Sequence, residues 1–226
     1  MRRPLVLGHG SGRAGDEFNS RASFERLMLT DVDGVELDVR RTADDVLAVR
    51  HDPHAPDGRL VSATCLAELP ADTLTLEQVL DICAGRLVNI EIKSFPQDPD
   101  HDPDERVTEL VVDLLAARDQ VDRVIVSSFG PACLARVRAR APHLPSAVLL
   151  FHPGDPDELL DAVVAGGHRI VHPYEPHVDE RFVAAARRRD LAVNVWTVRD
   201  DQATLDRLVA LDVDGIITGR PDRIHR

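Results

Sequence analysis

The chain has 226 residues, of which 43% are apolar and 29% are charged, a composition that suits one well-buried domain and is short for two. Its formal net charge of −12 argues against a nucleic-acid partner and against binding to an anionic membrane surface. No apolar run approaches the ~20 residues that a membrane-spanning helix needs, so membrane insertion is not expected. We therefore expect a single domain over residues 1–226, in an oligomeric state that the sequence leaves open.

The N-terminal residues predict a first strand rather than a leader sequence. Only residues 5–7 form an apolar run before Gly8 and His9, which is too short for the apolar region of a signal peptide. This pattern predicts a cytoplasmic location.

Short β-type runs alternate with helical patterns along the whole chain, which is typical of a parallel α/β architecture. Nine β-type runs are predicted, at residues 5–9, 34–39, 46–51, 87–93, 124–128, 147–151, 169–172, 192–197 and 215–218. Helices are predicted at residues 22–29, 131–140, 180–189 and 202–211. Three more helices are expected to begin near Thr75, Asp102 and Asp155, where capping residues precede a helical pattern.

The second and third β-type runs are too close together to be parallel neighbours. Only residues 40–45 separate Val39 from Val46, whereas a parallel crossover needs about a dozen residues or more. The two runs are therefore predicted to form a hairpin. The other eight predict an α/β fold of the (β/α)₈ TIM-type barrel class, with this β-hairpin added after the second strand.

Two carboxylates lie two residues apart in the predicted strand GVELDV. Glu36 and Asp38 then point to the same face, ~7 Å apart. They repel each other, and a hard cation with oxygen ligands would relieve that repulsion. If the hairpin turn centres between Ala43 and Asp44, His51 lies opposite Glu36 and shares its face.

A third carboxylate and a lysine follow in the strand sequence NIEIK. Glu91 and Lys93 share one face near the carboxyl end of a barrel strand, where active sites of this fold lie. Lys93 is the single lysine among 27 basic residues, which indicates a place where the compact ammonium matters. Three carboxylates suit Mg²⁺ or Ca²⁺, and His9 and His51 suit acid and base catalysis. A solvated strand face or a simple Glu91–Lys93 ion pair would explain the separate pieces without any site.

These motifs, in this order, resemble the glycerophosphodiester phosphodiesterase family of PLC-like TIM barrels. The resemblance continues through VIVSSF, VNVWTV and DGIITGRPD and so spans nearly the whole chain. It implies that Glu36, Asp38 and Glu91 bind a divalent cation, Mg²⁺ or Ca²⁺. It also implies that His9 and His51 are the catalytic pair, that Lys93 contacts the phosphate, and that Trp196 lines the pocket for the alcohol or glycerol part.

The chain departs from the family pattern at two positions near the first strand. The family usually has His-Arg-Gly there, but Gly10 stands at the arginine position. Phe18 stands where a later Glu-Asn-Thr motif has its glutamate. We hypothesise that Arg13, from the same glycine-rich loop, replaces the missing charge. The loop at residues 94–103 is expected to be a lid, a specificity wall or merely an exposed acidic segment.

The sequence thus predicts metal-dependent hydrolysis of a small glycerophosphodiester to glycerol phosphate and an alcohol, with histidine acid/base catalysis. One alternative is a phospholipase-like lyase that stops at a cyclic phosphate. The other is a catalytically silent barrel that binds a phosphate ligand, and the missing arginine is its main support.

Overall fold

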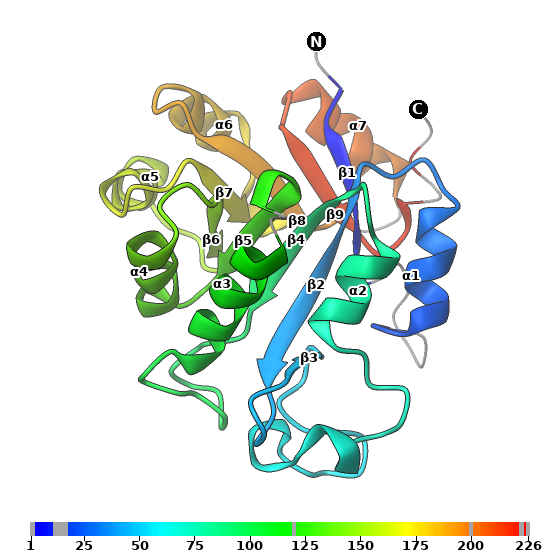
Figure 1. Ribbon diagram of the computed structural model, residues 1–226. Coiled ribbons are helices and arrows are strands. Elements are labelled where there is room, and N and C mark those ends of the chain that lie inside the picture. Colours follow the sequence, from blue (N-terminus) through cyan, green and yellow to red (C-terminus); the bar gives the residue numbers. More distant parts are fainter. Residues whose placement is uncertain (1–2, 11–17, 119–120, 199–200, 222–223, 225–226) are drawn as a thin grey trace.

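The computed structural model describes residues 3–10, 18–118, 121–198, 201–221 and 224. Eight parallel strands form a closed ring, because β1 pairs with β2 as well as with β9 (Figure 1). The ring strands are β1 (Leu5–His9), β2 (Gly34–Arg41), β4 (Leu87–Ile92), β5 (Val124–Ser128), β6 (Ser146–Leu150), β7 (Ile170–Pro173), β8 (Ala192–Val198) and β9 (Gly215–Thr218). The ninth strand, β3 (Leu47–Val49), pairs antiparallel with β2 outside the ring. The predicted TIM-type barrel with an added hairpin is confirmed.

Each connection between successive ring strands carries one α-helix, and the helices surround the barrel (Figure 1). They are α1 (Arg21–Met28), α2 (Leu76–Ile82), α3 (Arg106–Arg118), α4 (Pro131–Arg140), α5 (Pro156–Ala165), α6 (Glu180–Arg187) and α7 (Gln202–Ala210). Single 3₁₀ turns are η1 (Val61–Ala63), η2 (Leu66–Glu68), η3 (Val121–Arg123) and η4 (Glu175–His177). In the described part of the chain, none of the helices combines the length and the apolar character needed to cross a membrane.

The helix starts follow the capping patterns in two of three predicted places. Thr75 and Gln78 form a capping box at α2, and the Asp155 side chain accepts hydrogen bonds from the first turn of α5. The start expected at Asp102 is wrong, because α3 begins only at Arg106. The Asp102 carboxylate instead accepts from the amides of residues 104 and 106, and Glu105 has a φ of 55° that interrupts a helix there.

The hairpin forms as predicted, but its register differs by one residue. Val39 pairs with Val49 and not, as the predicted turn required, with residue 48. The Thr42 amide donates to the Val46 carbonyl at 2.9 Å, which leaves a three-residue loop with Asp45 at a φ of 60°. The predicted turn had a two-residue loop, and a three-residue loop that ends in a left-handed residue moves every pair by one residue. The predicted pairing of Glu36 with His51 is therefore wrong, and His51 lies beyond the end of β3.

The alternation of side chains along β2 separates the core from the site. Val35, Leu37 and Val39 are fully buried and pack in the cluster that also holds Phe24 of α1 and Leu76 of α2. Glu36 and Asp38 occupy the positions between them and point to the opposite face, into the barrel. Burying each of these apolar side chains stabilises the fold by about 1.5–3 kcal/mol, so the helices hold β2 firmly in place.

Candidate active site

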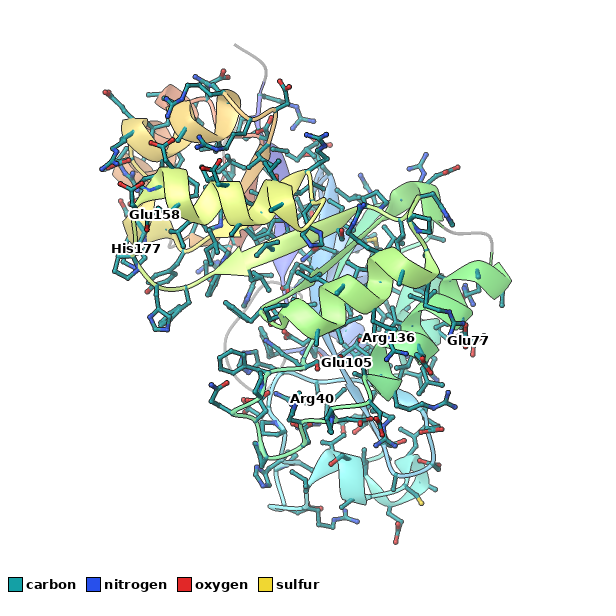
Figure 2. The ribbon with its side chains drawn as sticks, turned by 90° about the vertical axis from the view of Figure 1, so that its left-hand side faces the viewer. Arg40, Glu77, Glu105, Arg136, Glu158 and His177 are labelled. Atoms are coloured by element: carbon teal, nitrogen blue, oxygen red, sulfur yellow. The ribbon has the colours of Figure 1, made fainter. Side chains whose placement is uncertain are left out.

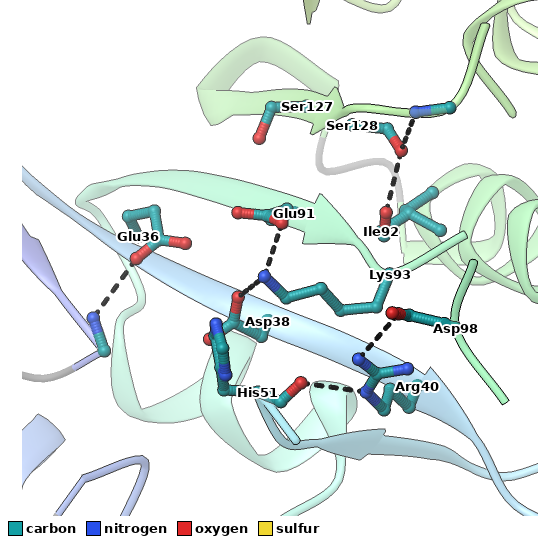
Figure 3. A network of polar contacts seen from close by, with 12 residues as sticks. Glu36, Asp38, Arg40, His51, Glu91, Ile92, Lys93, Asp98, Ser127 and Ser128 are labelled. Atoms are coloured by element: carbon teal, nitrogen blue, oxygen red, sulfur yellow. Dashed lines mark hydrogen bonds and ion pairs between the residues drawn. The ribbon is translucent and has the colours of Figure 1, made fainter. Parts of the chain in front are cut away.

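Three buried carboxylates meet inside the barrel at the carboxyl ends of β2 and β4 (Figure 3). Asp38 and Glu91 are register partners across these strands, and Glu36 precedes Asp38 on the same face. One oxygen of each of these three residues lies within 4.8 Å of the others, and the residues are at most 7% exposed. We call Glu36, Asp38 and Glu91 the acidic cluster. The period-two argument placed Glu36 and Asp38 on one face, and the position of Glu91 near the end of a barrel strand placed it with them; the structure brings all three together.

Lys93 lies against the acidic cluster. Its Nζ is 2.9 Å from Asp38 Oδ1 and 2.5 Å from Glu91 Oε1. Burial disfavours its charge, but Glu91 and Asp38 outweigh burial and raise the pKa of Lys93, so it is an ammonium at neutral pH. That single positive group offsets only part of the charge of three carboxylates. The simple Glu91–Lys93 ion pair considered as an alternative to a site is present, but it leaves the charges of the other two carboxylates uncompensated or only partly compensated.

Glu36 has the least compensated charge in the acidic cluster. Its Oε2 accepts a hydrogen bond from the Gly10 amide at 3.2 Å, while Oε1 has no hydrogen-bond partner among the described residues. Burial raises the pKa of Glu36 well above its usual value, and repulsion from Asp38 and Glu91 adds to the shift. Asp38 Oδ2 also lacks a partner in the described chain. Oxygens buried without partners, in a group of hard ligands, fit a divalent cation.

The other two carboxyl groups respond differently to the same surroundings. Burial raises the pKa of Glu91, and Lys93 reverses only part of that rise. Burial also acts to raise the pKa of Asp38, but Lys93 and the two histidines outweigh it, so the net shift is downward. Asp38 is therefore the member of the acidic cluster that stays ionised most readily.

His9 and His51 lie beside the acidic cluster. His9 ends β1, and its Nε2 is 3.7 Å from Glu36 Oε2. Burial lowers the pKa of His9 to about 4, so its imidazole is neutral at pH 7 and can accept a proton. The His51 side chain is 52% exposed, and its Nδ1 lies 2.8 Å from Asp52 Oδ1. The His9 side chain is 24% exposed, so its ring is the more enclosed of the two.

Phe18 lies between the two histidines and fills the space beside Gly10. Its ring centroid is 5.7 Å from that of His9 and 6.3 Å from that of His51. Gly10 has a φ of +49°, and a Cβ added there would lie 1.9 Å from Phe18 Cε2. The two departures from the family pattern are therefore one structural feature: an aromatic ring occupies the place that a side chain at residue 10 would need.

Gly10→Ala is expected to destabilise the protein, with part of the loss carried by Phe18. The left-handed backbone alone costs an L-residue about 1–2 kcal/mol, and the added methyl must displace the ring. Thermal unfolding of Gly10→Ala, Phe18→Ala and the double variant measures the coupling. We expect the double variant to be more stable than the sum of the single losses predicts; strictly additive losses would mean that the ring does not oppose a side chain at residue 10.

Aromatic side chains occupy the opposite half of the barrel mouth, after strands β4 to β7 and on β8. Phe24 and Phe182 are buried in the core, and Phe18 lies beside the two histidines, whereas the remaining aromatic residues follow or lie on strands β4 to β8. Those in mutual ring contact, with centroids 5.1–6.2 Å apart, are Phe95, Phe129, Phe151, Tyr174 and Trp196, which we call the aromatic wall. Trp196 is central, because its ring contacts three of the others and its Nε1 donates to the His172 carbonyl at 2.7 Å. Partly exposed rings in mutual contact offer an apolar surface on which a ligand could pack.

Of the predicted site residues, the three carboxylates, Lys93 and the two histidines are brought together, whereas Trp196 lies in the aromatic wall. Arg13 lies outside the described residues, so its proposed role has no structural counterpart here. Sequence reasoning missed the wall residues other than Trp196, and it missed Arg40. The period that identified Glu36 and Asp38 continues to Arg40 on the same face of β2, so that signal was available.

Comparisons with known proteins agree with this geometry. A model of the glycerophosphoryl diester phosphodiesterase family matches residues 10–223. A glycerophosphodiester phosphodiesterase of Caldanaerobacter subterraneus is 27% identical over an alignment that covers 98% of this chain and 96% of that protein. One of Bacillus altitudinis is 29% identical, with 96% and 95% covered. A solved Oleispira antarctica phosphodiesterase, in complex with its product sn-glycerol-3-phosphate, matches with a TM-score of 0.87 over 98% of this chain and 95% of that one; at 20% identity it supports the fold alone.

Proposed function

The chain belongs to the glycerophosphoryl diester phosphodiesterase family and is a phosphoric diester hydrolase, and on that premise we propose that it converts glycerophosphodiesters to glycerol phosphate and an alcohol with a divalent cation. The observation that carries the proposal is the acidic cluster, with its unpartnered oxygens, beside Lys93 at the carboxyl end of the barrel. The two bacterial relatives named as glycerophosphodiester phosphodiesterases support the choice of a glycerophosphodiester as substrate.

Glu36, Asp38 and Glu91 would hold the cation, either Mg²⁺ or Ca²⁺, since all three offer carboxylate oxygens. A cation bound there would stabilise negative charge on the phosphate. Lys93 would contact a phosphate oxygen, because its ammonium is fixed by Asp38 and Glu91 at the same place. A divalent cation together with the Lys93 ammonium would balance the charge of the three carboxylates, so an anionic substrate would no longer meet net negative charge at this point.

His9 and His51 would share the proton transfers. One histidine takes a proton from the nucleophile and the other gives a proton to the leaving oxygen. The neutral state of His9 supports a proton-accepting role for that residue. The nucleophile is water or a neighbouring glycerol hydroxyl; the second route passes through a cyclic phosphate. Phosphorus NMR of the products distinguishes a hydrolase from a lyase that stops at the cyclic phosphate.

The aromatic wall would bind the alcohol or glycerol part, with Trp196 at its centre. Trp196→Ala is then expected to raise KM about tenfold or more while kcat changes little, because the wall binds ground state and transition state alike. Trp196→Phe keeps a ring and removes the indole donor, so it separates stacking from the bond to His172. Kinetics with glycerophosphocholine and glycerophosphoethanolamine measure both; an unchanged KM in Trp196→Ala would remove the residue from the binding site.

The direct test of the proposed function is hydrolysis of glycerophosphocholine, glycerophosphoethanolamine and a chromogenic diester. Each is assayed with Mg²⁺, with Ca²⁺ and with a chelator. Activity that requires the cation supports the proposal. Activity that survives the chelator contradicts the cation's role, and inactivity towards every diester contradicts the substrate class.

A further inference from the structure

A buried arginine follows the acidic cluster on the inner face of β2. Arg40 is 3% exposed, and every side-chain nitrogen of it has a partner (Figure 3). Its Nη1 lies 2.6 and 2.7 Å from the two carboxylate oxygens of Asp100, and its Nη2 is 2.9 Å from Asp98 Oδ2. Its Nε donates to the main-chain carbonyl of His51 at 2.9 Å. One guanidinium therefore joins a proposed catalytic residue to a segment about 50 residues away in sequence.

His51 needs such a contact because little else fixes it. It lies beyond β3, which ends at Val49, so no strand ladder continues through it. Its ring is 52% exposed and contacts the Asp52 carboxylate, itself 76% exposed, and Phe18 edge-on at 6.3 Å between centroids, so packing holds the side chain only on one side. Its position is set mainly through the main chain, by the Arg40 bond and by the preceding amide of Arg50, which donates to the Asp38 carbonyl at 3.0 Å.

The other side of the Arg40 contact is the segment after β4, residues 93–105, which we call the β4 loop. Its base is fixed by the buried pair of Ser94 and Glu105, with Ser94 Oγ donating to Glu105 Oε1 at 2.9 Å. Figure 2 shows Arg40 and Glu105 at the same end of the barrel. Phe95 of this loop contacts Phe129 of the aromatic wall, with ring centroids 6.2 Å apart. These contacts hold the loop in place, which fits the expected specificity wall better than the expected lid.

We propose that Arg40 is a positioning residue, which holds the main chain of His51 against the β4 loop so that the ring stays aligned with the acidic cluster. The inference rests on the proposed catalytic role of His51. A lysine at this position keeps the charge but has no fork to reach Asp98, Asp100 and the carbonyl together. A misplacement of a catalytic group by about 1 Å can lower a rate up to ~10²-fold, so a loosened His51 has a measurable effect.

The test is the kinetics of Arg40→Lys, with Arg41→Lys as the matched control. Arg41 lies next to it on β2 and pairs with Asp45 at 3.0 Å and with Asp102 of the β4 loop at 3.9 Å. In the described chain it has no hydrogen bond to His51, so it controls for the loss of a guanidinium beside the same loop. We expect kcat of Arg40→Lys to fall about tenfold or more with KM changed less than about threefold. Arg41→Lys should keep kcat within about twofold of the parent. An unimpaired kcat in Arg40→Lys would overturn the inference.

A double-mutant cycle with His51→Ala separates positioning from general structural damage. If Arg40 acts through His51, Arg40→Lys lowers kcat less than about twofold in the His51→Ala background. An equal loss in both backgrounds means that Arg40 acts by another route and overturns the inference. A His51→Ala variant of normal kcat would instead refute the role of His51 in the proposed function. Should Arg40→Lys fail to fold, Asp100→Asn replaces it in the same cycle. This variant weakens the hold of the β4 loop on the guanidinium but keeps the donor to the His51 carbonyl, so the same loss of kcat and the same dependence on His51 are expected.

Discussion

Alanine at His9 or at His51 is expected to lower kcat at least ~10²-fold, the usual scale for a lost acid or base group. His9 is partly buried beside Glu36 and neutral, and His51 is half-exposed on the far side of Phe18. Among the described residues, the side-chain hydrogen bond of these rings is that of His51 to the exposed Asp52 carboxylate, so the loss of either ring should not unfold the barrel. The measurement is kcat at saturating glycerophosphodiester and cation, with a melting curve for each variant.

The matched control is His54→Ala, an exposed histidine in the segment that also contains His51. It should retain normal kcat. A chromogenic diester then assigns the two roles, because a leaving group of low pKa needs no proton. The variant that lacks the general acid regains activity on that substrate, whereas the variant that lacks the base does not. Near-normal kcat in either alanine variant, on a substrate with a poor leaving group, would refute the role of that histidine.

The acidic cluster was predictable because it depends on two short-range rules. Period two sets Glu36 and Asp38 on one face of β2, and the carboxyl ends of parallel strands meet at one edge, which brings Glu91 beside Asp38. Strand bounds likewise followed from apolar runs: those of β1, β5 and β9 agree fully, and the others differ by one or two residues. These features depend on residues close together in the sequence, so they can be predicted without the packing of distant segments.

What the sequence analysis missed depends on single turns and on side-chain contacts between distant segments. The Asp45 φ of 60° adds one residue to the hairpin loop and changes its register, although His51 still reaches the site from beyond β3. The pairing of Arg40 with Asp100 joins positions 60 residues apart, and no periodicity predicts it. The mutual fit of Gly10 and Phe18 became visible only from the distance between the ring and an added Cβ.

The acidic cluster leads to the second large effect: Glu36→Gln is expected to abolish cation-dependent hydrolysis and yet to stabilise the protein without a cation. Glu36 is buried, its Oε1 has no partner in the described chain, and burial followed by repulsion from its neighbours raises its pKa. A carboxyl group whose pKa is raised on folding opposes folding once the pH is high enough to ionise it in the unfolded chain. Glutamine removes that opposition, so Tm should rise by about 2–4 °C for each kcal/mol gained.

The cation gives a readout that does not depend on activity. Mg²⁺ or Ca²⁺ at 100 times its dissociation constant should stabilise the parent protein by about 2.7 kcal/mol, and this rise in Tm should vanish in Glu36→Gln. Glu25→Gln is the matched control, since Glu25 is exposed and, among the described residues, its ion pair is with Arg21 of the same helix. If Glu36 served only a structural ion pair, Glu36→Gln would lower the Tm of the protein, and the Tm of the parent would not depend on the cation. Opposite changes in activity and in cation-free stability therefore indicate a metal site, whereas a parallel loss of both would show that the carboxylates serve the fold.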